Sequence, residues 1–165
     1  MRTDAKGATN VRPFEPGAWF HTMTRLGNLF VRPLLRSSAG KNMHELALLC
    51  FDGRRTGKRY EVPVAYHELD GDPLILTASG WKANLRGGAD VEVVHDGRRT
   101  AMRAELIEDA DGVARIYEAL LLKDGLEGAK PTKIGLKVEG DRMPTYAEIA
   151  AAVAGKRCVV RLHRR

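Results

Sequence analysis

The sequence predicts a mainly β domain of the α+β class, in which about six short antiparallel strands form a small barrel accompanied by helices. Two observations predict it. Short apolar runs are separated by turn signals, two of which are Asp-Gly pairs typical of tight hairpins. Helical periodicity is confined to a segment near the start, one past the middle and one near the end. Consecutive hairpins imply antiparallel pairing, and so many strands over one core favour a barrel.

The length of 165 residues suits a single core. We expect a flexible leader over residues 1–16 and one domain over 17–165. The leader has no apolar core of signal-peptide length, and no run approaches the ~20 apolar residues of a membrane span. These features predict a cytoplasmic protein.

The first predicted helix runs from Trp19 to Leu35, where apolar residues recur at helical spacing and basic residues lie near the other face. Pro33 is expected to end or kink it. Two interpretations of residues 17–36 stay open. The helix covers the open end of the core, or it makes a peripheral contact with a membrane surface.

Apolar runs place the strands that follow. The predicted strands are His44–Phe51, Tyr60–Leu69, Pro73–Ser79, Val91–His95, Arg99–Ile107 and Arg157–Leu162. The Asp-Gly pairs at residues 70–71 and 96–97 are predicted to turn two hairpins. Two later helices are predicted, from Val113 to Leu122 and from Pro144 to Ala154. Thr145 and Glu148 are expected to form a capping box at the start of the second.

The charge favours an anionic partner. With 27 basic against 21 acidic residues the net charge is +6, which suits nucleic acid, acidic lipid or a phosphorylated small molecule. Aromatic residues make up only 6%, and no nucleic-acid recognition signature is present. We therefore expect a small-molecule ligand and no nucleic-acid partner.

Cysteine and histidine contribute no evident chemistry. Cys50 and Cys158 each lie in an apolar run, which predicts buried thiols in a reduced state. The five histidines are scattered singly without the short spacing of zinc ligands, so no metal site is predicted. No Gly-x-Ser-x-Gly elbow exists for a nucleophilic serine.

The basic turn GRRTGKR, residues 53–59, is the strongest local signal. Its two glycines permit backbone conformations in which amides converge, and its cations can bind a tetrahedral anion. It is not a Walker loop, because the glycines are too close together and a strand follows. A phosphate site and a solvated hairpin tip are both open interpretations of this turn.

A second stretch, TASGWKANLRGGADVEV, covers residues 77–93. A strand there ends in small residues, which let a flat ring approach the backbone. Trp81, Asn84 and Leu85 then begin a short helical turn whose amides can receive an anion or a carbonyl oxygen. A core role for Trp81 is the open alternative.

Together the two stretches resemble the deazaflavin-dependent nitroreductase and quinone reductase family. The matching motifs are GRRTGKRYEVP, LDGD, TAS, WKANL and VEV, and they cover roughly residues 44–107. The resemblance implies a six-stranded split β-barrel related to FMN-binding barrels. It also implies use of coenzyme F-420, a deazaflavin with a phosphate-linked polyglutamate tail, and this polyanionic tail suits the basic turn.

The resemblance also implies which residues bind the cofactor. The turn contributes Gly53, Arg54, Arg55, Thr56, Gly57, Lys58 and Arg59. The next strand contributes Val62 and Pro63. The second wall contributes Ala78, Ser79, Gly80, Trp81, Asn84 and Leu85.

The implied activity is hydride transfer between reduced F-420 and a small nitro compound, quinone or activated alkene. No obligatory acid is evident, and Tyr66 and Ser79 are the weak candidates for a catalytic proton donor. The chain departs from the family at Tyr60, where an Arg is expected, at the short loop around Gly80, and after Leu120, where a tyrosine-rich helix is missing.

Other assignments remain open. An FMN-dependent reductase would keep the barrel and change the flavin. A non-catalytic carrier would hold a fatty acid or haem in the barrel, and Tyr60 favours that alternative. A monomer and a homodimer are both compatible with the sequence.

Overall fold

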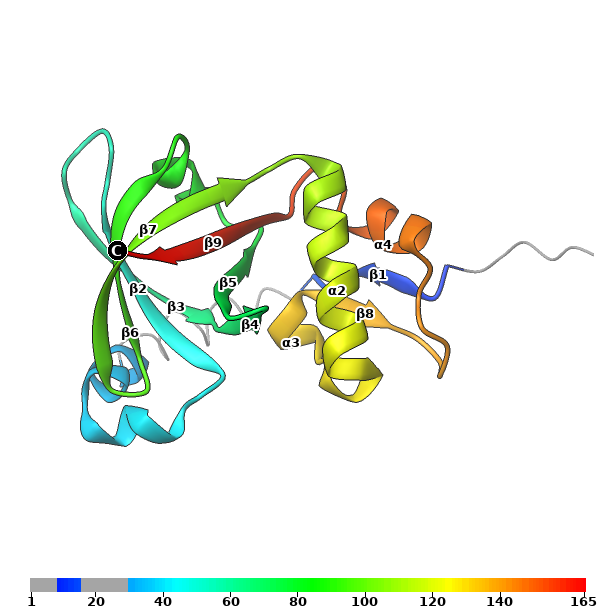
Figure 1. The fold of residues 1–165 in the computed structure, drawn as a ribbon, viewed down its shortest axis with the longest axis horizontal. Helices are drawn as coiled ribbons and strands as arrows, with labels where there is room; N and C mark the ends of the chain where they lie inside the picture. Colours follow the sequence, from blue (N-terminus) through cyan, green and yellow to red (C-terminus); the bar gives the residue numbers. More distant parts are fainter. Residues whose placement is uncertain (1–8, 16–29) are drawn as a thin grey trace, which may run out of the picture. The chain divides into compact units, whose positions relative to one another are not determined.

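The computed structural model of the protein describes residues 9–15 and 30–165, and the fold is mainly β as predicted (Figure 1). Seven antiparallel strands form the main sheet, and two more form a separate small sheet. The strands are β1 (Val11–Pro13), β2 (Leu46–Asp52), β3 (Arg59–Ala65), β4 (His67–Leu69), β5 (Asp72–Thr77), β6 (Ala89–His95), β7 (Arg98–Ile107), β8 (Leu136–Val138) and β9 (Cys158–Arg164). The helical elements are η1 (Ser38–Asn42), η2 (Gly80–Leu85), α2 (Ala110–Gly128), α3 (Pro131–Ile134) and α4 (Tyr146–Val153).

The chain forms two compact units. Of the described residues, the barrel unit comprises 30–108 and 158–165, and the helical unit comprises 9–15 and 109–157. The single domain expected over residues 17–165 stays a prediction. Within the expected flexible leader, residues 11–13 form strand β1, which pairs with β8.

The main sheet curls into a half-barrel because of how its edge strands are joined. The strand order is β3-β2-β6-β7-β9-β5-β4, so β3 and β4 lie at opposite edges. Yet only Tyr66 separates them in sequence. The sheet must therefore bend until its edges meet at Tyr66. The predicted count of six strands is wrong because the run from Tyr60 to Leu69 breaks here into two strands.

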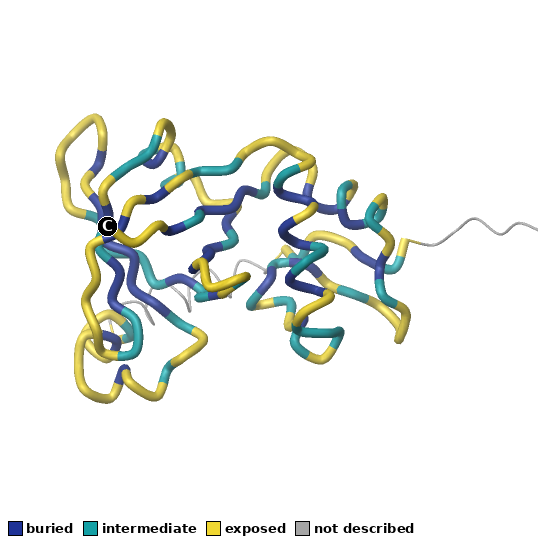
Figure 2. Tube along the Cα trace, in the orientation of Figure 1, coloured by how far each residue is buried: buried dark blue, intermediate teal, exposed yellow. Residues whose placement is uncertain are grey.

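Strand β2 is buried on both faces, which explains its unbroken apolar sequence (Figure 2). Leu49 and Phe51 belong to the cluster inside the half-barrel. Leu48 and Cys50 belong to a second cluster on the outer face. Alternation along a strand sends successive side chains to opposite faces, so both clusters come from one run.

The two Asp-Gly turns have the predicted geometry. Asp70 and Gly71 have φ values of 53° and 84°, and Asp96 and Gly97 have φ values of 50° and 71°. Positive φ at both central residues is the type I′ pattern that matches the twist of a hairpin. These turns set the registers of β4–β5 and β6–β7, which are antiparallel as predicted.

Most of the predicted helix from Trp19 to Leu35 lies outside the described residues, but residues 30–36 are helical. Leu35 is buried in the outer cluster beside β2, with Val31 packed against it. Phe30 on another face of this helix is 74% exposed. The described turns of the helix therefore cover core residues, while the membrane contact of residues 17–36 stays a prediction. No helix in the described part of the chain is both long and apolar enough to cross a membrane.

The helical unit holds the two later helices. Helix α2 extends beyond the predicted Val113–Leu122 at both ends, and α4 is shorter than the predicted Pro144–Ala154. Asp109 caps α2 by accepting a hydrogen bond from the Gly112 amide. The predicted capping box of α4 is confirmed, because Thr145 accepts from the Glu148 amide and Glu148 accepts from the Thr145 amide. Strands β1 and β8 and helix α3 were not predicted.

Acid is expected to weaken the α4 cap. Hydrogen bonds from Arg142 first, then from Thr145, lower the pKa of Glu148 from its ordinary value of 4.5 to about 2. A lowered folded-state pKa contributes stability above pH 4.5, and that contribution is lost as pH falls towards 2. The free energy of unfolding of Glu148→Gln should thus depend less on pH in this window. Urea unfolding at a series of pH values measures this free energy, and the exposed Glu127→Gln serves as the control. Parallel pH profiles for wild type and Glu148→Gln would contradict this account.

Candidate functional site

The basic turn at residues 53–58 is a closed loop. The Gly53 amide donates to the Lys58 carbonyl at 2.8 Å, and the Gly57 amide donates to the Gly53 carbonyl at 2.8 Å. Gly57 adopts φ of 65°, which favours glycine. Thr56 Oγ1 accepts from the Lys58 amide at 3.3 Å. The loop is therefore held by its own bonds, as a preformed binding loop would be.

Asn84 joins this loop to the second predicted stretch. Its Oδ1 accepts from the Arg54 amide at 3.1 Å, and its Nδ2 donates to the Trp81 carbonyl at 2.9 Å. The Arg54 guanidinium also donates to the Arg86 carbonyl at 2.9 Å. The two stretches picked out by sequence thus lie side by side. We call this surface the loop–η2 surface: residues 53–59 together with 78–86.

Aromatic rings support the loop from inside the half-barrel. Tyr60 stacks on Phe51 with ring centroids 5.5 Å apart, and Trp81 lies 5.7 Å from Phe51. Gly53 is buried against this stack, and a Cβ there would come within 2.8 Å of the Tyr60 ring. Tyr60, where the resembling family is expected to carry Arg, therefore has a packing role here. Leu85 anchors η2 in the same core cluster.

Ion pairs use some of the cations on the loop–η2 surface. Arg59 pairs with Asp52 at 3.4 Å and with Glu92 at 3.1 Å. Arg86 makes two 2.9 Å bonds to Glu108, which lower the pKa of that carboxyl group. These ion pairs hold Arg59 and Arg86 in place beside the loop. Their positive charges are therefore already partly neutralised and less able to attract an anionic ligand.

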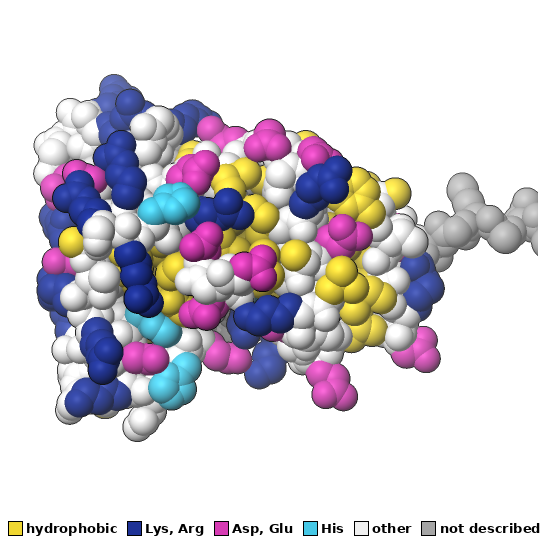
Figure 3. Space-filling view, in the orientation of Figure 1, with side chains coloured by type: hydrophobic (Ala, Val, Ile, Leu, Met, Phe, Trp, Pro, Cys, Tyr) yellow, Lys and Arg dark blue, Asp and Glu magenta, His cyan; other side chains and the backbone are white. Residues whose placement is uncertain are grey.

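Arg55 and Lys58 remain available. Both are exposed, and neither side chain has a hydrogen-bond or ion-pair partner within the part of the chain that the structure describes. Lys and Arg side chains also gather at the left of Figure 3, over the barrel unit. The loop amides of Gly53, Arg54 and Gly57 are already bonded. An anion at this loop would therefore rely mainly on these two side chains.

The remaining predicted cofactor residues fall on both faces of the barrel wall. Val62 packs against the inner cluster, whereas Pro63 pairs with Leu48 and lies on the alternate face. The exposed segment from Ala78 to Gly80 leads from β5 into η2. Ser79 occupies the cap position of η2 and makes no side-chain capping bond, so its hydroxyl is available.

Tyr66 lies at the other end of the half-barrel. Strand β3 runs seven residues from Arg59 beside the loop to Ala65, a length of ~20 Å. Figure 1 shows the β2–β3 loop and the β6–β7 turn at opposite ends of the barrel unit. The pKa of Tyr66 is raised, mainly by burial of the side chain and next by the negative charge of Glu68. The structure therefore groups Ser79 with the loop and separates Tyr66 from it.

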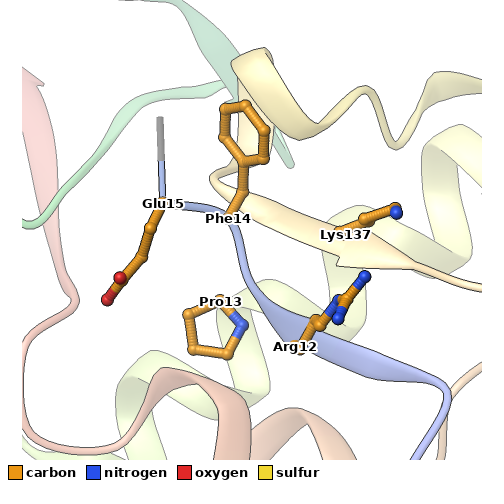
Figure 4. A pocket seen from close by; sticks show the side chains of 5 residues that line it. All are labelled: Arg12, Pro13, Phe14, Glu15 and Lys137. Atoms are coloured by element: carbon orange, nitrogen blue, oxygen red, sulfur yellow. The ribbon is translucent and has the colours of Figure 1, made fainter. Parts of the chain in front are cut away.

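The barrel unit contains a cavity of about 860 Å³ beside Tyr66, and the helical unit contains one of about 460 Å³. Figure 4 shows the smaller one, where Arg12 and Lys137 point to the same side from neighbouring strands. Both cations pair with Glu139, at 2.6 and 3.3 Å. Neither cavity is lined by a residue of the 53–58 loop.

Both cysteines are free and buried, as predicted. Burial is the main reason that the pKa of Cys50 is raised, so this thiol is poorly suited to nucleophilic chemistry. Within residues 9–15 and 30–165, no group of His, Cys, Asp and Glu side chains is placed to hold a metal ion.

Sequence reasoning missed Arg86, Glu108 and Glu92 as supports of the site. Arg86 pairs with Glu108 across 22 residues, and Glu92 meets Arg59 across 33. Neither pairing has a local signature, because each depends on the register of strands that meet only in the folded barrel.

Asn84 is expected to control the order of the loop. Asn84→Ala removes the acceptor for the Arg54 amide, and a lost hydrogen bond is typically worth about 1 kcal/mol. Hydrogen exchange of the Arg54 amide should accelerate about fivefold in the variant. Exposed Asn42→Ala serves as the control, and unchanged exchange at Arg54 in Asn84→Ala would contradict the assigned contact.

No protein-family model and no curated protein matches the chain. Solved structures do match. The conserved hypothetical protein Rv2991 from Mycobacterium tuberculosis is 20% identical, with 78% of each chain covered and a TM-score of 0.51. An F420-H2 dependent reductase (FDR-A) is 19% identical over 72% of this chain and 94% of its own, with a TM-score of 0.46. A pyridoxamine 5'-phosphate oxidase-related, FMN binding protein from Nostoc punctiforme is 12% identical over 92% and 83%, with a TM-score of 0.45.

These likenesses concern the fold. The similarity to the mycobacterial protein supports the architecture of the main sheet described above, a curled antiparallel half-barrel.

Proposed function

We propose that the protein is a deazaflavin-dependent oxidoreductase whose loop–η2 surface binds the anionic tail of coenzyme F-420. One observation carries the proposal. Arg54, Asn84 and Arg86 join the basic loop to η2, so that the two stretches resembling the deazaflavin family form one surface.

The donor set on this surface fits an oxyanion. Arg55 and Lys58 are exposed cations on a loop whose backbone is fixed by Gly53 and Gly57. A fixed loop loses little conformational freedom on binding, and charge-assisted hydrogen bonds to phosphate are stronger than neutral ones. These two side chains would hold the phosphate and the start of the glutamate tail.

A reduced deazaflavin, when bound, supplies a hydride to an electrophilic acceptor such as a nitro compound, quinone or activated alkene. The protein would position the ring against the acceptor and shield both from water. Val62 and Trp81 offer apolar surface beside the loop. Ser79, free of a capping bond, can donate a proton to an acceptor held there. The fit of the acceptor against these apolar side chains, more than an acid of unusual pKa, would then set specificity.

The test is turnover. Purified protein with reduced F-420 and a quinone or nitroaromatic acceptor should oxidise the coenzyme faster than the same mixture without protein. Ser79→Ala should slow turnover even when the coenzyme is saturating. If FMN is reduced or oxidised instead and F-420 is not, the barrel uses the ordinary flavin. The absence of activity with both F-420 and FMN would reject the proposal.

A further inference from the structure

The end of the half-barrel away from the loop–η2 surface opens into the cavity of about 860 Å³. Its volume lies within the ~300–1,000 Å³ typical of small-molecule sites. Val93 and Met102, members of the inner core cluster, form part of its lining. The cavity is therefore the exposed end of the apolar barrel interior.

A stacked pair of rings forms one wall of the cavity. Tyr66 and His95 lie with ring centroids 3.6 Å apart and an interplanar angle of 14°. His95 Nε2 donates to the His44 carbonyl at 2.9 Å, which fixes the orientation of the imidazole. Such a wall favours planar aromatic ligands, because rings stack in offset arrangements.

Three cations surround this wall. Lys41 comes from η1, Arg98 from the start of β7 and Arg164 from the end of β9. None of the three has an ion-pair partner among the residues that the structure describes. Of the two acids that line the cavity, Asp96 is bonded to His44 at 2.7 Å. The second acid is Glu68, so three cations line the cavity against two acids.

We propose that this cavity is a second ligand site, for a planar aromatic carboxylate. The ring would lie against the Tyr66–His95 pair and Met102, and the carboxylate would meet Arg98 and Arg164. Guanidinium groups bind carboxylates with two parallel hydrogen bonds, which suits this placement. The site is independent of deazaflavin binding at the opposite end of the barrel.

The probe for this site is 2-naphthoate, added to the full-length protein labelled at its methionine methyl groups. NMR should show a saturable shift of the Met102 methyl signal, which Met102→Leu identifies. Arg164→Gln and Arg98→Gln should each weaken binding about tenfold. Exposed Arg32→Gln lies on the 30–36 helix, does not line the cavity, and should leave the affinity unchanged.

A neutral analogue separates the carboxylate from the ring. Naphthalene-2-carboxamide should bind at least about tenfold more weakly than 2-naphthoate. The absence of a saturable shift at Met102, equal binding of the carboxamide, or full affinity in both arginine variants would each overturn the proposal. F-420 turnover does not enter these measurements, so this site and the proposed function can fail separately.

Discussion

Leu85→Ala is expected to lower the free energy of unfolding by about 2–5 kcal/mol. Leu85 is 0% exposed and fixes η2 to the inner core cluster of the half-barrel. Removing its branched end leaves a cavity next to well-packed neighbours, which relax only partly. Because η2 also carries Asn84 and Trp81, the variant should lose order on the loop–η2 surface as well. Urea unfolding followed by Trp fluorescence measures the effect.

A matched control comes from the same residue type in an exposed position. Leu122 in α2 is 67% exposed, so Leu122→Ala should change the free energy of unfolding by no more than about 0.5 kcal/mol. Similar losses in Leu85→Ala and Leu122→Ala would show that η2 is not anchored as described.

The second large effect is expected on coenzyme binding. In Arg55→Ala/Lys58→Ala, F-420 should bind about 100-fold more weakly, because each lost charge-assisted hydrogen bond costs about 1.5 kcal/mol or more. The side chains are exposed, so the fold should survive. The salt dependence of binding should also become shallower, since fewer ions are exchanged when the anionic tail binds.

The control double variant removes two positive charges from another part of the chain. Arg32 and Lys130 are exposed and lie outside the loop–η2 surface. Arg32→Ala/Lys130→Ala should bind F-420 as wild type does, apart from a small general effect of net charge. Equal weakening in the two double variants would mean that overall charge, and not the loop, attracts the coenzyme.

Local signals predicted much of the fold. The Asp-Gly turns at 70–71 and 96–97 have the expected positive φ angles. The Thr145–Glu148 capping box formed as expected, because its bonds join residues three apart. The apolar run from His44 to Phe51 predicted a strand, and β2 occupies Leu46–Asp52.

What depends on distant partners was not predictable. The break at Tyr66 has no local turn signature, since it arises from the meeting of the two sheet edges. Strand β1 is three residues long and becomes visible only through its pairing with β8. The stacking of Tyr60 on Phe51 likewise follows from the β2–β3 register.

The same division holds for the candidate site. The sequence singled out the loop and η2 separately, and the resemblance to a family joined them. Their contact through Asn84 is a property of the fold. The residue type and strand position of Tyr66 suggest a proton donor, but the length of β3 separates Tyr66 from the loop.

Calorimetric titration with two ligands tests most directly whether the basic loop holds the coenzyme's tail. One ligand is coenzyme F-420, and the other is the same deazaflavin without phosphate or glutamates. We expect F-420 to bind at least about tenfold more tightly, with the difference abolished in Arg55→Ala/Lys58→Ala. Equal affinity for the two compounds, or no saturable binding of F-420, would contradict the role assigned to the loop.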